Sequence, residues 1–84
     1  TAIAQLTALK AEIGDLNKVK RIVKVFGMVN SDPSFTSQPA VINGFSDLMV
    51  EVFGDRGKHA RAAVGMASLP MNICVEVEMI VEIE

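Results

Sequence analysis

Apolar residues recur at helical spacing near the start of the chain and again in its middle. The first stripe consists of Ile3, Leu6, Leu9 and Ile13, and Gly14 follows it as a typical helix end. The second stripe consists of Val41, Phe45, Leu48 and Val52, widened by Ile42, Met49 and Phe53. We expect this second helix to begin at Thr36 or Ser37, to hold Pro39 in its first turn and to end at Gly54.

Two other stretches carry β-branched and alternating residues, which predict strands over 18–29 and 73–84, and a short stretch of small residues predicts a third strand over 60–66. In the first stretch, alternation places Lys18, Lys20 and Lys24 on one face and Val19, Arg21, Val23 and Val25 on the other. In the last stretch it places Ile73, Val75, Val77, Val81 and Ile83 on one face and Cys74, Glu76, Glu78, Glu82 and Glu84 on the other.

The order of elements is therefore α-β-α-β-β, in which a strand, a helix and a strand form a parallel crossover. This order predicts an α+β fold, with a sheet that carries both helices on one face. The charges add a pairing prediction: lysines on the first strand and glutamates on the last would attract one another across neighbouring strands. The alternative is that each charged face is simply solvated.

The apolar content is high for so short a chain. Half of the 84 residues are hydrophobic and six more are glycine, about 57% together, against roughly 45–50% in ordinary soluble domains. A chain of this length buries only about 60–65% of its unfolded surface. The surplus predicts a subunit interface, or membership of a longer domain whose start lies upstream of Thr1.

Composition disfavours several classes of function. A net charge of −2 provides no positive field for nucleic acid, and a single cysteine and a single histidine cannot build a disulfide or a zinc site within one chain. No segment has the length and apolarity of a membrane span or the pattern of a secretory leader. The expectation is a cytoplasmic protein without a metal, and no phosphate loop or nucleophile elbow names a reaction.

A few residues stand out as candidates for chemistry. Arg61 lies in a strand of small residues and needs a carboxylate, a ligand or solvent; a salt bridge to a glutamate of the last strand is the structural alternative. Glu76 and Glu78 are potential general bases or members of a solvated strand face.

Three further residues have weaker claims to a role in chemistry. Asn43 could reach a ligand, or could be exposed while Gly44 packs closely on the sheet. Cys74 and His59 are interpreted as a small core residue and an exposed polar residue.

Several segments together resemble the YjgF family of reactive-intermediate deaminases, also known as endoribonuclease L-PSP or translation inhibitor proteins. They are GKHARAAVG at 57–65, LP at 69–70 and VEVE at 75–78, preceded by GDL at 14–16 and by NGFSD at 43–47 in the second helix, in the style of a longer-chain branch. The resemblance covers nearly the whole chain. It implies a chorismate-mutase-like fold, a homotrimer and active sites in clefts between subunits.

The resemblance also implies an activity, the hydrolysis of reactive 2-imino and enamine acids to 2-oxo acids and ammonia without a cofactor. By position, Arg61 matches the arginine that holds the substrate carboxylate, and Glu76 matches the acid that orients water. Asn43 matches a polar helix residue near the site, and the backbone of Ala63 stands where the family often has cysteine. Residues 1–84 then correspond to the C-terminal portion of one domain, and the N-terminal strands, with a tyrosine that lines the site, are absent from this chain.

Two other functions stay open on the sequence. The cleft could bind small carboxylates such as 2-oxo acids without turnover, as a ligand-binding or interaction module. A ribonuclease is the least favoured, because the acidic balance and the absence of Tyr and Trp leave few platforms for stacking bases.

Overall fold

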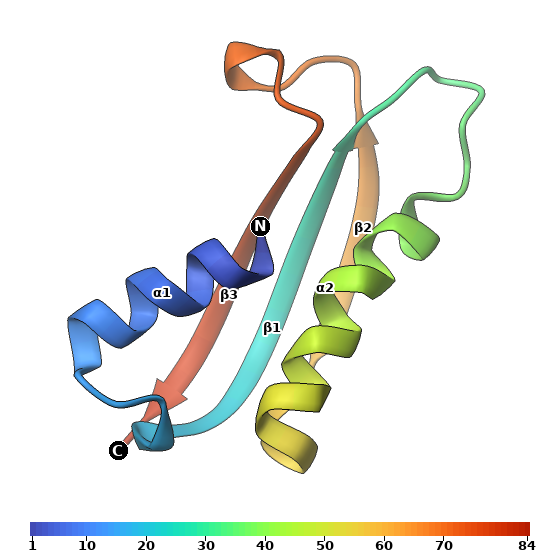
Figure 1. Cartoon of the computed structure of the whole chain (residues 1–84). Coiled ribbons are helices and arrows are strands. Elements are labelled where there is room, and N and C mark those ends of the chain that lie inside the picture. The colour runs from blue at the N-terminus through green and yellow to red at the C-terminus, as the bar shows by residue number, and fades with distance from the viewer.

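A three-stranded sheet with two helices on one face makes up the structure, a computed structural model that describes residues 1–84 (Figure 1). The elements are α1 (Ala2–Ile13), β1 (Val19–Asn30), α2 (Gln38–Phe53), β2 (Ala60–Met66) and β3 (Val75–Ile83). The strand order is β2-β1-β3, with β1 parallel to β2 and antiparallel to β3. This arrangement confirms the predicted α+β class, the element order and the parallel crossover.

The helix ends follow the local signals in the sequence. Ser37 is the N-cap of α2, and Pro39 stands in the first turn, where its missing N–H costs nothing. Gly14 and Gly54 end the two helices with φ of 86° and 63°, which only glycine adopts without strain. The last strand is shorter than the expected 73–84, since β3 runs from Val75 to Ile83, and a 3-10 turn at residues 70–72 precedes it.

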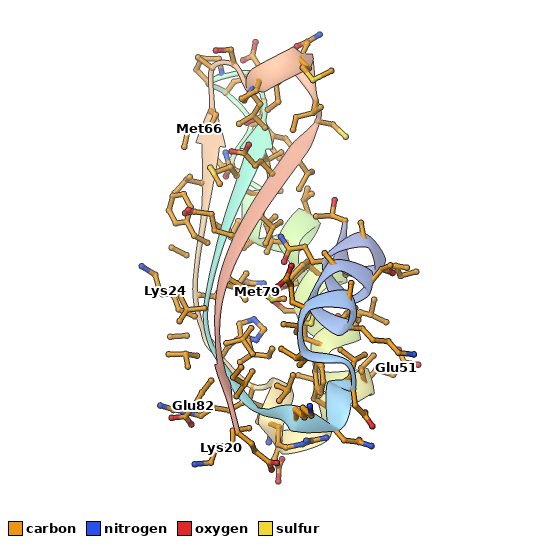
Figure 2. The ribbon with its side chains drawn as sticks, turned by 90° about the vertical axis from the view of Figure 1, so that its left-hand side faces the viewer. Lys20, Lys24, Glu51, Met66, Met79 and Glu82 are labelled. Carbon is orange, nitrogen blue, oxygen red and sulfur yellow. The ribbon has the colours of Figure 1, made fainter.

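The core lies between the sheet and the helices. Its most deeply buried side chains are Val19, Ile22 and Val25 of β1 together with Ile42 and Met49 of α2. The opposite face of the sheet carries no helix, and Lys24 and Glu82 point out from it (Figure 2). Nine large apolar residues stay exposed, including Ile80 at 58%, so the apolar surplus noted in the sequence is visible on the folded surface.

Strict alternation along β1 proved wrong at its start. The register against β3 shifts between Val19 and Arg21 and again between Ile22 and Lys24, so at each shift β1 contains one residue more than β3. These bulges bring Val19, Ile22 and Val25 to the core face at intervals of three, where alternation had placed Val19, Val23 and Val25. Arg21 is consequently exposed instead of sharing the core face.

The charged strands are neighbours, as predicted, but the lysines do not face the glutamates. Lys24 stands opposite Ile80, while Glu76 and Glu78 stand opposite Met28 and Phe26. The one ion pair between the strands joins Arg21 Nε to Glu82 Oε1 at 3.4 Å, and both side chains are about half exposed. An ion pair this exposed stabilises the fold by less than about 1 kcal/mol, so the backbone ladder and apolar burial, rather than charge, hold β1 beside β3.

The loop between β1 and α2 contains a carboxylate with a shifted pKa. The backbone N–H and the hydroxyl of Ser34 both donate to Asp32 Oδ1, at 2.9 and 2.7 Å. The backbone hydrogen bond first, and the hydroxyl second, lower the pKa of Asp32 below its usual value. Because the folded pKa is depressed, this contribution to stability is present near neutral pH and is lost as the pH falls through the folded pKa.

Replacing Ser34 with alanine should raise the pKa of Asp32 only part of the way toward its usual value, because the backbone donor remains. Carboxyl carbon shifts followed by NMR across an acid titration would measure the change. Ser37→Ala is the matched control, since the Ser37 side chain makes no capping hydrogen bond. An unchanged Asp32 titration in Ser34→Ala would contradict the assigned role of the hydroxyl.

Candidate functional site

Arg61 lies on β2, at an edge of the sheet, on the face covered by α2 (Figure 1). Its Nη1 donates to Asn43 Oδ1 at 2.8 Å and to Ser46 Oγ at 3.2 Å, so two residues of α2 hold one end of the guanidinium. The alternative, a salt bridge from Arg61 to a glutamate of the last strand, is absent. Since Nη1 carries only two hydrogens, the edge formed by Nε and Nη2 remains available for a carboxylate.

Ser46 connects Arg61 to the single histidine. The Ser46 Oγ lies 3.0 Å from His59 Nε2, and His59 Nδ1 lies 2.6 Å from the carbonyl oxygen of Gly57. A carbonyl oxygen only accepts, so Nδ1 carries the proton and a neutral His59 presents the Nε2 lone pair to the serine hydroxyl. His59 is therefore a half-buried, oriented side chain and not the exposed polar residue expected from the sequence.

These side chains line an open pocket of about 250 Å³ formed by Ser46, Val50, Lys58, His59 and Arg61. Two lining residues carry a positive charge, and none is acidic. Lys58 Nζ pairs with Asp55 at 3.1 Å, but both side chains are largely exposed and free to separate. The pocket thus has the charge and the hydrogen-bond donors to receive a small anion.

Glu76 does not meet Arg61 within one chain. Val77 belongs to the core cluster and Val75 and Met79 pack against it, so Glu76 and Glu78 point to the face without helices. Arg61 stands in register with Val25, whereas Glu76 stands opposite Met28, and β1 separates the two strands that carry them. Glu76 is half-buried and Glu78 is exposed. No ion pair joins either of them to a lysine.

The remaining candidates fall in different surroundings. Asn43 is exposed and contacts Arg61, while Gly44 is not packed on the sheet: a Cβ there would meet nothing within 4 Å. Ala63 follows Arg61 by two residues on the same face of β2 and lies half-buried opposite Gly27. Cys74 is exposed, which corrects its interpretation as a core residue.

Sequence reasoning missed Ser46 altogether. Asn43 and Ser46 are three residues apart, which puts them on one face of a helix, and His59 and Arg61 are two apart, which puts them on one face of an extended segment. Those two spacings are the only sequence features that could have indicated that Ser46 and His59 lie near Asn43 and Arg61. No group of three or more His, Cys, Asp or Glu side chains gathers where it could hold a metal ion, and none of the helices is long and apolar enough to span a membrane.

The sequence and structure of this chain resemble those of known proteins. Residues 1–83 match the sequence profile of the family described as "YjgF/chorismate mutase-like, putative endoribonuclease". Protein TCP17 of Trypanosoma cruzi is 51% identical over 83 residues, which are 98% of this chain and 52% of that protein.

Two solved structures have the same fold. The crystal structure of Atu1372 from Agrobacterium tumefaciens, a protein of unknown function, superposes on this chain with a TM-score of 0.96 at 52% sequence identity. The matched region is 99% of this chain and 53% of the Atu1372 chain. The crystal structure of a putative endoribonuclease from Shewanella oneidensis has a TM-score of 0.92 at 29% identity, covering 98% and 54%. The chain thus spans about half the length of the proteins it matches.

Proposed function

Because the chain belongs to the YjgF/chorismate mutase-like family, we propose that it hydrolyses reactive 2-imino and enamine acids to 2-oxo acids and ammonia. One observation carries this proposal: Arg61, fixed through Nη1 by Asn43 and Ser46, presents a free guanidinium edge beside a small positively charged pocket. A 2-imino acid carries a carboxylate, and a planar guanidinium binds a carboxylate through two parallel hydrogen bonds. Anchoring that carboxylate places the C=N carbon within reach of water.

In the proposed reaction, water attacks the imine carbon, and collapse of the resulting carbinolamine releases ammonia and the 2-oxo acid. Asn43 holds Arg61 in place, and the Ala63 backbone borders the site. We assign Glu76 the orientation of the attacking water. The separation of Glu76 from Arg61 within one chain requires that the two act together across a boundary between chains.

We propose that the protein forms a homotrimer whose active sites lie in the clefts between subunits, where Arg61 and Glu76 of different chains can act together. The helix-free face of the sheet supports it, because that face carries the exposed Ile80 and the half-buried Phe26 and Val64 beside Glu76 and Glu78. A second copy that covers this face would bury apolar surface and bring Glu76 against a neighbour. The N-terminal half of the same domain, implied by the family resemblance, would complete the pocket.

Paired glutamate variants test the water-orienting role. With 2-iminobutanoate generated freshly in the assay, Glu76→Gln should slow ammonia release by about 100-fold, the scale of a lost general base. Glu78→Gln is the matched control, because Glu78 lies on the same face of β3 but is more exposed than Glu76, and it should retain the wild-type rate. Equal rates for Glu76→Gln and wild type would remove Glu76 from the mechanism, and a wild-type rate no faster than buffer would reject the proposed function.

A second candidate is a module that binds small carboxylates without turnover. The specific observation in its favour is that the pocket of one chain contains Arg61 and no carboxylate to activate water. Titration calorimetry with 2-oxobutanoate, run beside the imine assay, separates the two: heat of binding without ammonia release would establish the module.

Ribonuclease activity is named in the descriptions of the family and of the Shewanella relative. We rank it below the other two functions, since a net charge of −2 and 5% aromatic residues give RNA little to bind. Cleavage of RNA by the purified chain that disappears on substitution of Arg61 would reverse this ranking.

A further inference from the structure

Ser46 and His59 have the arrangement of a nucleophile and its general base. With a neutral ring protonated at Nδ1, the serine hydroxyl donates to His59 Nε2 over 3.0 Å, and the Gly57 carbonyl orients the ring by accepting from Nδ1 over 2.6 Å. A base oriented by a third group and hydrogen-bonded to a hydroxyl is the constellation that activates serine in hydrolytic enzymes. In the imine hydrolysis proposed above, Ser46 only helps to hold Arg61 in place, and His59 has no role.

Arg61 changes the chemistry of the serine oxygen. Its Nη1 donates to Ser46 Oγ at 3.2 Å, so the oxygen is within reach of a positive charge as well as a base. A neighbouring cation favours negative charge on the attacking oxygen and on the oxyanion that forms next to it. Ser46, His59, Arg61 and Lys58 all line the same open pocket, so a small reagent can approach the oxygen from solvent.

We propose that Ser46 is a histidine-activated nucleophile and that this pocket hydrolyses small activated esters through an acyl-serine intermediate. Ser46 Oγ forms a bond to the ester carbonyl carbon while His59 Nε2 takes the hydroxyl proton. The bond from that carbon to the leaving oxygen then breaks, and His59 returns the proton to the departing alcohol or phenol. Water, deprotonated by the same nitrogen, releases the carboxylic acid and restores the serine hydroxyl.

Reagents that react with activated serines test the proposal directly. We would treat the 84-residue chain with a small alkyl fluorophosphonate, locate adducts by peptide mass spectrometry, and follow p-nitrophenyl acetate hydrolysis in parallel. We expect one adduct, on Ser46, and release of nitrophenolate above the rate in buffer. Ser46→Ala should abolish both signals, whereas Ser37→Ala, which alters an exposed serine at the start of α2, should change neither.

His59→Gln separates activation from mere exposure of the hydroxyl, because glutamine keeps a polar side chain but provides no base. We expect labelling of Ser46 to slow by about 100-fold, within the range of general-base contributions, while circular dichroism confirms that the variant stays folded. Labelling of Ser46 at the wild-type rate in His59→Gln, or no Ser46 adduct in the folded wild type, would overturn the proposal.

The tests of the serine proposal and of the proposed imine hydrolysis can fail independently of each other. Ammonia release from 2-iminobutanoate without a Ser46 adduct would refute only the serine proposal. A Ser46 adduct without ammonia release would support it and refute only the proposed deaminase.

Discussion

Replacing Arg61 with alanine is expected to lower the rate of 2-iminobutanoate hydrolysis at least about 100-fold. Each charge-assisted hydrogen bond from a guanidinium to a carboxylate contributes about 1.5–3 kcal/mol, and the free Nε–Nη2 edge of Arg61 offers two. A loss of about 3 kcal/mol in transition-state stabilisation corresponds to more than a hundredfold in rate. Ammonia release at substrate concentrations below saturation would measure kcat/KM, the parameter that reports this loss.

The same substitution should leave the fold and the oligomeric state unchanged. The hydrogen bond that Arg61 gives to Asn43 is exposed and the one that it gives to Ser46 is only partly buried, so water can replace the lost donor at either oxygen. Arg61→Lys is the matched variant, because lysine keeps the charge but not the planar fork, and we expect it to recover only part of the activity. Wild-type kcat/KM in Arg61→Ala, with thermal denaturation unchanged, would remove Arg61 from the substrate site.

The largest expected effect on stability comes from Gly57. This buried glycine lies where the 3-10 turn after α2 crosses the last turns of the helix, and a Cβ there would overlap the carbonyl oxygen of Met49 and lie 3.0 Å from the Cα of Val50. The atoms in the way belong to the backbone, so no side chain can rotate to make room. Gly57→Ala should therefore destabilise the chain by about 3 kcal/mol, the upper part of the range for overpacking, and lower Tm by roughly 12–24 °C.

Gly44 provides the opposite case within the same region. It lies inside α2, and a Cβ there would meet nothing within 4 Å. Gly44→Ala should raise stability by about 0.5–1 kcal/mol, since alanine is the better helix former. Calorimetric melting of both variants would check the pair, and a Gly57→Ala melt at or above the wild-type Tm would contradict the steric argument.

Destabilisation at Gly57 also bears on the serine site. The carbonyl oxygen of Gly57 accepts from His59 Nδ1 and thereby orients the ring toward Ser46. Moving this backbone to fit a Cβ would move the acceptor, so we expect Gly57→Ala to reduce labelling of Ser46 even in the fraction of molecules that remains folded.

Local sequence signals predicted the elements closely because their causes are local. Apolar spacing, a proline in a first turn and a glycine past a last turn act within a few residues, and each helix ends where its glycine stands. The β-branched runs likewise predicted β1 and β3, a short run of small residues predicted β2, and the parallel crossover from β1 to β2 followed from their order. The pairing of β1 with β3 was correct although its electrostatic reason was wrong, since no lysine of β1 pairs with a glutamate and the one ion pair between the strands joins Arg21 to Glu82.

The tertiary structure decided everything that depends on residues distant in sequence. Two bulges reset which side chains of β1 face the core, because pairing with β3 determines the register and no pattern within β1 records it. The contacts of Arg61 with α2 span 15 and 18 residues, and the contact of Ser46 with His59 spans 13. Strand order and side-chain alternation together put Arg61 and Glu76 on opposite faces.

The sequence by itself thus determined the class of fold, the start of α2, the C-terminal ends of both helices and the residue types available for chemistry. Short-range sterics and hydrophobic spacing act between residues close together in the chain, so their effects can be predicted from the sequence. Which of those residues meet was decided by packing α2 across the parallel pair β1 and β2, which brings Asn43, Ser46, His59 and Arg61 together and leaves Glu76 on the open side of the sheet. A meeting of side chains depends on register and layer order, and these are fixed only when the strands and helices bury their apolar faces together.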